Sequence, residues 1–323
     1  MKPLLSVNNL SVHFSTGSGV IKAVDQISYA LNAGETLGIV GESGCGKSVS
    51  ALSLLRLIPS PPGKIVGGEI LFDGKDLLKA TKKELSSIRG NRIAMIFQEP
   101  MTSLNPVQRI GWQVREPLLI HKKLKKHRAT AEAINALQKV RIPDGENRIQ
   151  DFPHQFSGGM RQRAMIAMGL TCAPKLIIAD EPTTALDVTI QAQLLSLMKQ
   201  LTRETGAALM IITHNLGIIA RYADRVNVMY AGRIVEKAAA GELYKHPMHP
   251  YTIGLMASVP QLNQNVNARL TPIEGQPPDL ADLPAGCAFA PRCRFAVERC
   301  RVETPPLRSI FDGHEIACWV DVE

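Results

Sequence analysis

The sequence predicts an α/β protein built around a parallel sheet that helices cover on both faces, followed by a small cysteine-containing extension. Two short, fully apolar runs, Leu176–Ala179 and Ala208–Ile212, stand between helical stretches, and each ends in polar residues. Strands that are apolar throughout are typical of parallel sheets buried on both faces. Ligands of such sheets bind at the carboxyl ends of the strands, so we expect the functional side chains there.

The remaining elements follow in chain order. The chain is strand-rich as far as Ala80, and the candidate strands there are Leu5–Val7, Ser11–Phe14, Ala23–Leu31, Thr36–Val40 and Glu69–Phe72. Helical character dominates from about Lys82 to Val140, and Ala129–Val140 is its clearest segment. From Gln261 the chain has seven prolines and little periodicity. We therefore place a domain boundary near residue 260, with one domain over 1–260 and an extension over 261–323.

Composition says more about where the protein acts in the cell than about which partners it binds. The chain has 323 residues, of which 45% are hydrophobic and 20% charged, as in a globular protein with a large core. No stretch approaches the roughly 20 apolar residues that span a bilayer, and the N-terminus lacks a signal-peptide core. We expect a cytoplasmic protein that acts on a membrane only from its surface. The net charge of +8 suits nucleotides, anionic lipid or nucleic acid alike.

A phosphate-binding loop is the first chemical motif. It fits the pattern G-x-x-x-x-G-K-[ST], follows the apolar run Leu37–Val40 and opens a helical pattern, as the motif requires. Its residues are Gly41, Glu42, Ser43, Gly44, Cys45, Gly46, Lys47 and Ser48. Backbone amides at a helix N-terminus surround phosphate oxygens, Lys47 reaches the β- and γ-phosphates, and Ser48 offers a hydroxyl to Mg²⁺.

Cys45 has two interpretations. It is a small spacer whose backbone binds phosphate, the interpretation we prefer, or a thiol whose oxidation would block nucleotide binding.

A pair of acids ends the apolar run Leu176–Ala179, on a predicted buried strand far downstream of Lys47. Asp180 is placed to hold Mg²⁺, and Glu181 to polarise the water that attacks the γ-phosphate. Two neighbouring acids in a phosphate site repel one another, so Mg²⁺ must offset their charge.

The motif Ser157-Gly158-Gly159 precedes the acid pair along the chain and opens the predicted helix Gln162–Leu170. Its amides and the Ser157 hydroxyl would form a second anion-binding helix N-terminus. Together with the phosphate loop and the acid pair, this segment resembles the ABC ATPases. Further matches in the family's order are Gln98, Asp187 and His214.

Phe14, which precedes the phosphate loop, stands where an aromatic of that family stacks on adenine. The alternative for Phe14 is an ordinary core phenylalanine.

The resemblance implies a P-loop NTPase cassette: a RecA-like core with an antiparallel β subdomain and an α-helical subdomain at about 85–165. Two such subunits would close head to tail on ATP and Mg²⁺. The phosphate loop of one would face Ser157, Gly158, Gly159 and Asp187 of the other.

In that arrangement Glu181 is the general base and His214 contacts the γ-phosphate, while Gln98 touches Mg²⁺ or the water. Asn215 departs from the aspartate that relatives commonly carry after the histidine.

Longer matches resemble the peptide and nickel importer branch. They lie at Met95–Pro106, Ala179–Gln193, Met229–Gly232 and His249–Thr252. This implies ATP-driven peptide import at the cytoplasmic face of the membrane, with a paralogous ATPase or a second copy, two permease subunits and an extracytoplasmic binding protein. The alternatives are nickel or another small solute, and remotely a soluble ATPase acting on nucleic acid. A nickel site at His246 and His249 competes with a simple loop between helices.

Four cysteines crowd into the end of the chain: Cys287, Cys293, Cys300 and Cys318. In a cytoplasmic protein such a cluster favours metal or redox chemistry over structural disulfides. The extension resembles the C-terminal region of the importer branch, which implies a [4Fe–4S] cluster on these thiolates. Zn²⁺, or reduced cysteines packed in a small domain, remain alternatives.

Overall fold

The computed structural model describes residues 2–17, 19–98, 103–183, 187–258, 273–311 and 313–322. These residues form two compact units, which we describe separately. Unit 1 holds residues 32–35 and 79–212, and unit 2 holds residues 3–31, 36–78 and 213–323. The boundary that we place near residue 260 lies outside the described residues and stays a prediction. We call residues 273–322 of unit 2 the tail.

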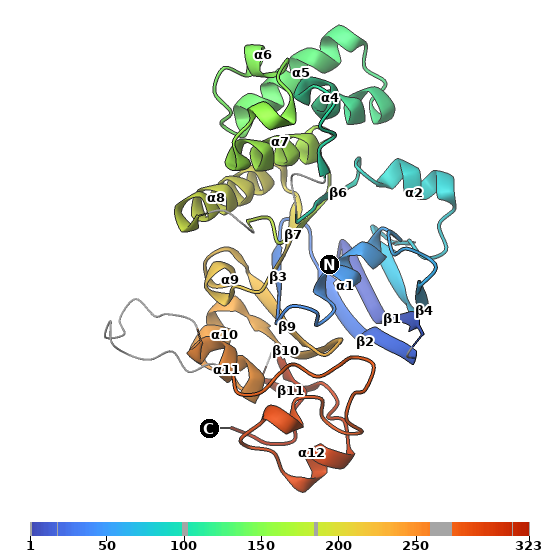
Figure 1. Cartoon of the computed structure of the whole chain (residues 1–323), viewed down its shortest axis with the longest axis vertical. Coiled ribbons are helices and arrows are strands. Elements are labelled where there is room, and N and C mark those ends of the chain that lie inside the picture. Colours follow the sequence, from blue (N-terminus) through green and yellow to red (C-terminus); the bar gives the residue numbers. More distant parts are fainter. Residues whose placement is uncertain are drawn as a thin grey trace. The chain divides into compact units, whose positions relative to one another are not determined.

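Unit 2 begins with an antiparallel sheet in the order β2-β1-β4-β5, which lies beside α1 (Lys47–Leu54) in Figure 1. Its strands are β1 (Leu5–Thr16), β2 (Gly19–Leu31), β4 (Gly63–Phe72) and β5 (Lys75–Asp76). The two strands predicted at Leu5–Val7 and Ser11–Phe14 are one continuous strand, because register shifts after Val7 and Leu10 let the pairing with β2 continue.

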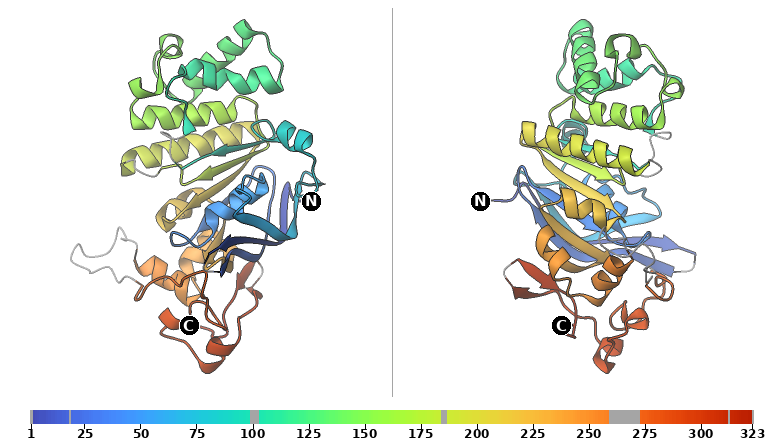
Figure 2. Two further views of the ribbon diagram at one scale, coloured as in Figure 1. Left: turned by 45° about the vertical axis from the view of Figure 1, so that its right-hand side comes forward. Right: turned by 90° about the vertical axis from the view of Figure 1, so that its left-hand side faces the viewer.

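A second set of strands in unit 2 links the phosphate loop to the tail. β3 (Thr36–Val40) has the predicted bounds and runs parallel to β9 (Arg225–Tyr230). β9 pairs antiparallel with β10 (Arg233–Ala239). The tail then adds the hairpin β11 (Arg308–Phe311) and β12 (His314–Ile316), and β12 pairs with β10. Figure 2 shows the tail, in red, continuing from this end of the unit.

Short helices complete unit 2. They are α1 (Lys47–Leu54), α9 (Leu216–Tyr222), α10 (Ala240–Lys245), α11 (Pro250–Ala257) and α12 (Glu298–Val302), with a 3-10 turn, η2, at Ala290–Arg292. Helix α1 opens directly after the phosphate loop that follows β3.

Unit 1 contains three parallel strands in the order β8-β7-β6. They are β6 (Ile93–Ile96), β7 (Leu176–Asp180) and β8 (Ala208–Thr213). Every residue of β7 and β8 is buried, which agrees with the apolar runs that predicted a sheet covered on both faces. The α/β class is confirmed. The prediction of helix from Lys82 to Val140 is wrong at β6, because a four-residue apolar run has no periodicity that separates strand from helix.

The helices of unit 1 pack mainly on one another, and one of them also packs against β6. They are α2 (Lys82–Ile88), α4 (Ile110–His121), α5 (Lys126–Lys139), α6 (Gly145–Arg148), α7 (Gly158–Leu170) and α8 (Val188–Thr205), with a 3-10 turn, η1, at Pro153–Gln155. In α5 the buried residues Ala129, Ala133 and Leu137 recur every four positions and form one packed face. Figure 2 shows α7 and α8 side by side in both views. Within the described ranges, none of the helices combines the length and apolarity of a bilayer span.

Candidate functional site: the phosphate loop and the acidic strand end

The phosphate loop in unit 2 depends on glycine at two positions. Gly41 and Gly46 have φ angles of 155° and 100°. A Cβ on Gly41 would lie 2.1 Å from the Met229 carbonyl oxygen, and one on Gly46 would lie 2.1 Å from that of Ala23. Both the backbone conformation and the space therefore exclude a side chain, and the loop can turn its amides inward.

Lys47 lies at the centre of this loop as the first residue of α1. Only 4% of Lys47 is exposed. Its Nζ donates hydrogen bonds of 2.8 Å to the carbonyl oxygens of Gly41 and Glu42. The loop thus folds around the Lys47 ammonium group, whose positive charge is suited to bind an anionic polyphosphate.

Cys45 is buried beneath the loop, with its Sγ 3.8 Å from Lys47 Nζ. Burial raises the pKa of the Cys45 thiol, although the Lys47 charge opposes that effect. A thiol that stays protonated and buried reacts slowly. The geometry therefore favours the interpretation of Cys45 as a small spacer.

The other site residues of unit 2 lie on α1, β1 and the segment before α9. Ser48 is the second residue of α1 and is half-buried. Phe14 is a half-buried residue of β1 paired with Gly63, so it is not a fully buried core residue. His214 is exposed and directly precedes Asn215, whose Oδ1 accepts from Ile218 N at 3.4 Å and caps α9. Asparagine caps a helix as well as aspartate does, which explains why this departure from the family pattern is tolerated.

In unit 1, the end of β7 carries the acid pair. Asp180 is the last residue of the strand and is 6% exposed. Glu181 follows with a φ of 44°, and its backbone N–H donates to Ile212 O at 2.8 Å. The side chain of Gln98, from the segment after β6, donates from Nε2 to Glu181 Oε2 at 2.8 Å. The structure therefore joins the predicted general base Glu181 directly to Gln98, which the sequence predicts to contact nucleotide and Mg²⁺.

The two remaining motifs of unit 1 are helix N-caps. Ser157 caps α7, and its hydroxyl accepts from Met160 N at 3.3 Å. Asp187 caps α8, and its carboxylate accepts from Ile190 N at 2.9 Å. Ser157, Gly158 and Asp187 are exposed and Gly159 is half-buried, so this surface is open to a ligand or a second protein. Residues 99–102 and 184–186, which belong to the family matches, lie outside the described residues.

The four cysteines of the tail line one small cavity of about 10 Å³, together with His249, Phe289 and Trp319. All four are free thiols. Burial raises the pKa of Cys287 to about 11 and also raises the pKa values of Cys293 and Cys318, with neighbouring thiols adding to the shift. In the part of the chain that the structure describes, however, no three His, Cys, Asp or Glu side chains are arranged to hold a metal ion. The iron–sulfur prediction is thus not supported by this geometry.

The two histidines of the suggested nickel site have separate surroundings. His249 is 1% exposed and caps α11, where its Nδ1 accepts from Tyr251 N at 3.1 Å. His246 is exposed and lies 3.8 Å from Glu242 Oε1. Both stand between α10 and α11, as the interpretation of a loop between helices predicts.

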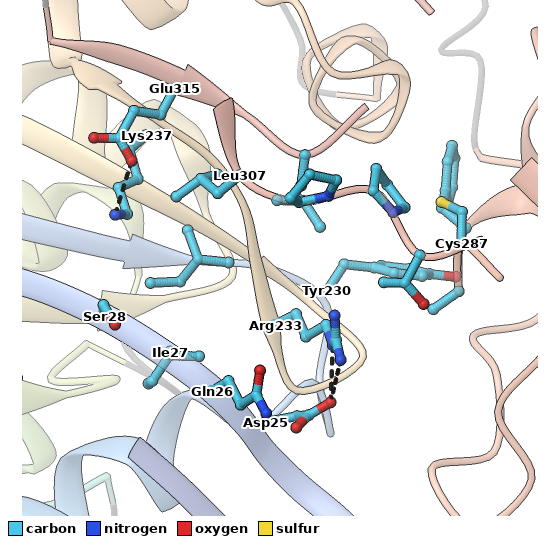
Figure 3. A pocket seen from close by; sticks show the side chains of 18 of the residues that line it. Asp25, Gln26, Ile27, Ser28, Tyr230, Arg233, Lys237, Cys287, Leu307 and Glu315 are labelled. Atoms are coloured by element: carbon cyan, nitrogen blue, oxygen red, sulfur yellow. Dashed lines mark hydrogen bonds and ion pairs between the residues drawn. The ribbon is translucent and has the colours of Figure 1, made fainter. Parts of the chain in front are cut away.

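A larger pocket of about 420 Å³ lies between β2, β10 and the tail. Figure 3 shows that its charged side chains face one another: Arg233 pairs with Asp25, and Lys237 pairs with Glu315. Its wall includes Tyr230, Cys287 and Phe289. Among the described residues that line this pocket, the charged side chains are therefore paired with one another.

Sequence reasoning missed one contact of the phosphate loop. Glu42 forms an ion pair with Arg292, 250 positions further along the chain. The only signal for this contact in the sequence is that Arg292 directly precedes Cys293 of the cysteine cluster.

Comparisons with known proteins agree with this geometry. The ABC transporter family profile matches residues 24–184, and the profile of the oligopeptide/dipeptide transporter C-terminal region matches residues 235–300. A probable peptide ABC transporter ATP-binding protein of Sinorhizobium fredii is 52% identical over 98% of this chain and 94% of its own. The oligopeptide transport ATP-binding protein of Haemophilus influenzae is 50% identical over 100% of this chain and 99% of its own.

Among solved structures, a dimeric ATP-binding cassette in a post-hydrolysis state bound to ADP and Pi covers 73% of this chain and 98% of its own, with 25% identity and a TM-score of 0.66. The fold is therefore that of an ABC cassette. Identities near one half over almost the full length establish more than the fold: the chain belongs to the ABC transporter ATP-binding proteins, in the branch with an oligopeptide/dipeptide transporter C-terminal region.

Proposed function

We propose that the chain hydrolyses ATP to drive the import of peptides through a membrane transporter. One observation carries this proposal: the same chain combines an ABC ATPase cassette with the C-terminal region of oligopeptide and dipeptide transporters. The name of a full-length relative, an oligopeptide transport ATP-binding protein, supports the same function.

In the proposed mechanism, unit 2 binds the nucleotide phosphates. The loop from Gly41 to Ser48 surrounds them with backbone amides, and Lys47 exchanges its two carbonyl partners for phosphate oxygens. Phe14 stacks on adenine and His214 contacts the γ-phosphate. For Mg²⁺ the proposed ligands are Ser48, Gln98 and Asp180, which would offer the oxygen donors that this cation prefers; the Asp180 carboxylate is buried. When bound, Mg²⁺ would neutralise phosphate charge during transfer.

Unit 1 supplies the proposed general base. The Gln98 amide donates to Glu181 Oε2, which orients the carboxylate for its proposed role of accepting a proton from the attacking water. The exposed N-caps Ser157 and Asp187, with Gly158 and Gly159, are suited to bind the nucleotide held by a second subunit. Because the γ-phosphate would bridge both subunits, hydrolysis would release them from one another.

We further propose the partners that this mechanism needs. The second cassette is a paralogous ATPase or another copy of this chain, and it closes head to tail as the dimeric cassette among the structural neighbours suggests. The pair acts at the cytoplasmic face of the membrane on two permease subunits, which receive solute from an extracytoplasmic binding protein. Nucleic acid is not a partner.

The test is uptake by cells that lack the gene, with labelled dipeptide, a longer oligopeptide and Ni²⁺ offered in parallel. We expect loss of peptide uptake, restored by the wild-type gene and not by Glu181→Gln. Loss of Ni²⁺ uptake alone would identify nickel as the transported solute in place of peptide, with the role in ATP-driven import unchanged. Persistence of all three would remove the peptide assignment.

For the tail we propose a soft metal site on Cys287, Cys293, Cys300 and Cys318. The donor chemistry supports it, since four thiolates suit a [4Fe–4S] cluster or Zn²⁺. The cavity of about 10 Å³ has room for about one water, so the thiols would have to move apart to admit a cluster. Metal analysis of anaerobically purified protein decides: about four irons per chain are expected, zinc would identify the alternative, and neither metal would leave packed thiols.

A further inference from the structure

Arg292 of the tail reaches the phosphate loop with its side chain. Its Nη1 and Nη2 donate to Glu42 Oε2 and Oε1 at 2.8 and 3.0 Å. Only 5% of the Arg292 side chain and 25% of the Glu42 side chain are exposed. A two-pronged pair that is this well shielded from water is held much more firmly than a surface ion pair.

The tail fixes the direction of this guanidinium. Nε donates to Glu274 O at 3.0 Å, and Nη1 also donates to the Tyr230 hydroxyl at 3.3 Å. The guanidinium carbon lies 5.9 Å from the ring centres of Tyr230 and Phe289. All three guanidinium nitrogens of Arg292 therefore have hydrogen-bond partners, and the two that bind Glu42 have little freedom to rotate.

A second contact holds the backbone of the same loop residue. The Glu42 N–H donates to the Tyr251 hydroxyl at 2.8 Å. Tyr251 is fully buried and packs against Tyr230 and Phe289, with ring centres 4.6 and 5.4 Å apart. Residue 42 is thus fastened at both its amide and its carboxylate by α11 and the tail.

The charge of Glu42 gives this contact a consequence for ATP. A free carboxylate in a loop that binds polyphosphate would repel its ligand, and Arg292 cancels that charge. We infer that Arg292 is a positioning residue for ATP binding: it neutralises Glu42, holds the phosphate loop in shape and thereby makes nucleotide affinity depend on the tail. This inference rests on the proposed role of the loop in binding phosphate.

A purely structural role for Arg292 makes a different prediction. If the pair only fastens the tail to the cassette, removing either partner should have the same effect. If Arg292 acts on ATP through the Glu42 charge, the two removals should have opposite signs. Loss of Arg292 leaves an unpaired negative charge beside the phosphates, whereas loss of the Glu42 charge leaves an unpaired positive one.

The experiment measures MgATP dissociation constants and steady-state ATPase kinetics on the full-length chain. We expect Arg292→Gln to weaken MgATP binding about tenfold, equivalent to about 1.4 kcal/mol, and to raise KM with kcat changed less than about twofold. Arg292→Lys should weaken binding less, because it keeps the charge and loses the fork. Glu42→Gln should tighten MgATP binding, because it removes a negative charge beside the phosphates. In the Glu42→Gln background, Arg292→Gln should cost less than about twofold.

Arg294→Gln is the matched control, because Arg294 is an exposed tail arginine two positions away that lies over the Phe295 ring. It should leave MgATP binding unchanged. An Arg292→Gln penalty of the same size in both Glu42 backgrounds would overturn the inference, and so would unchanged binding in Arg292→Gln. Lys47→Ala separates this failure from that of the site itself: if Lys47→Ala also binds MgATP normally, the loop assignment is wrong.

Discussion

The two units hold their functional residues in different ways. In unit 1 the caps Ser157 and Asp187 bond to amides three positions away and remain exposed. In unit 2 the phosphate loop is held by Tyr251 and Arg292, which are 209 and 250 positions from Glu42. A locally held, open surface suits a partner that must bind and leave, whereas a loop fastened from afar suits a site that must keep its shape. The comparison predicts that substitutions at the functional residues of unit 1 mainly change the rate of ATP turnover. Substitutions at those of unit 2 should mainly change the affinity for MgATP.

Glu181→Gln in unit 1 should have the largest effect. Without the base we expect kcat to fall about a thousandfold, or about 4 kcal/mol in activation free energy. MgATP affinity should be retained, because the phosphate loop is unaltered. Measurements of phosphate release and of equilibrium MgATP binding on the same preparation test the lower kcat and the retained affinity, respectively. Normal turnover would remove Glu181 as the base, and lost affinity would break the division of labour between the units.

Lys47→Ala in unit 2 should have the complementary effect. The ammonium group is buried and aimed within the loop, so its loss should weaken MgATP binding about a hundredfold, or about 2.7 kcal/mol. Lys245→Ala, at an exposed lysine of α10 in the same unit, is the control and should bind normally. Tight binding by the Lys47→Ala chain would contradict the role given to the loop.

Unit 2 should become less stable at acidic pH because of His249. Burial lowers the pKa of His249 to about 4, below its usual 6.5. The unfolded chain therefore takes up a proton first, so this contribution to stability is complete above pH 6.5 and falls as the pH drops towards 4. Between pH 7 and 5 the free energy of unfolding should fall by about 2 kcal/mol from this group.

The charged neighbour of His249 is Glu236, which accepts from the His249 backbone N–H at 3.0 Å and contacts His314 at 2.8 Å. The four tail cysteines line the cavity next to His249. Denaturant unfolding at several pH values measures the slope. His249→Asn keeps an N-cap and removes the titration, so its slope should be shallower. Equal slopes would show that another group governs the acid response.

Ser157→Ala should have the smallest effect on stability. The lost N-cap should cost about 1 kcal/mol of unfolding free energy. Thr81→Ala removes the N-cap of α2 in the same unit and should cost a similar amount. Only Ser157→Ala should also lower the ATPase rate, because only Ser157 is proposed to touch nucleotide. If both variants lose equal activity, Ser157 acts through folding alone.

The difference between the units also explains which features could be predicted from the sequence. Strand β3, the N-terminus of α7 and the acid pair follow from local patterns, since each depends on residues a few positions apart. Strand β6 is too short for its period to be read. The ion pair between Arg292 and Glu42 cannot be predicted from a local pattern. Its two residues are 250 positions apart and meet only when β10, α11 and the tail are packed. The cap that Asn215 provides is a local contact with Ile218, three positions on, but recognising it required the bounds of α9.

The pairing of β12 with β10 has a consequence for the behaviour of shortened chains. Glu236 and Lys237 of β10 pair with Ile316 and Glu315 of the tail. A chain cut before β11 would uncover this side of β10 and present unpaired amides and carbonyls next to the apolar residues Ile234 and Val235. Uncovered strand edges recruit other strands. The segment from Arg308 to the C-terminus should therefore govern solubility, and chains without it should associate as their concentration rises.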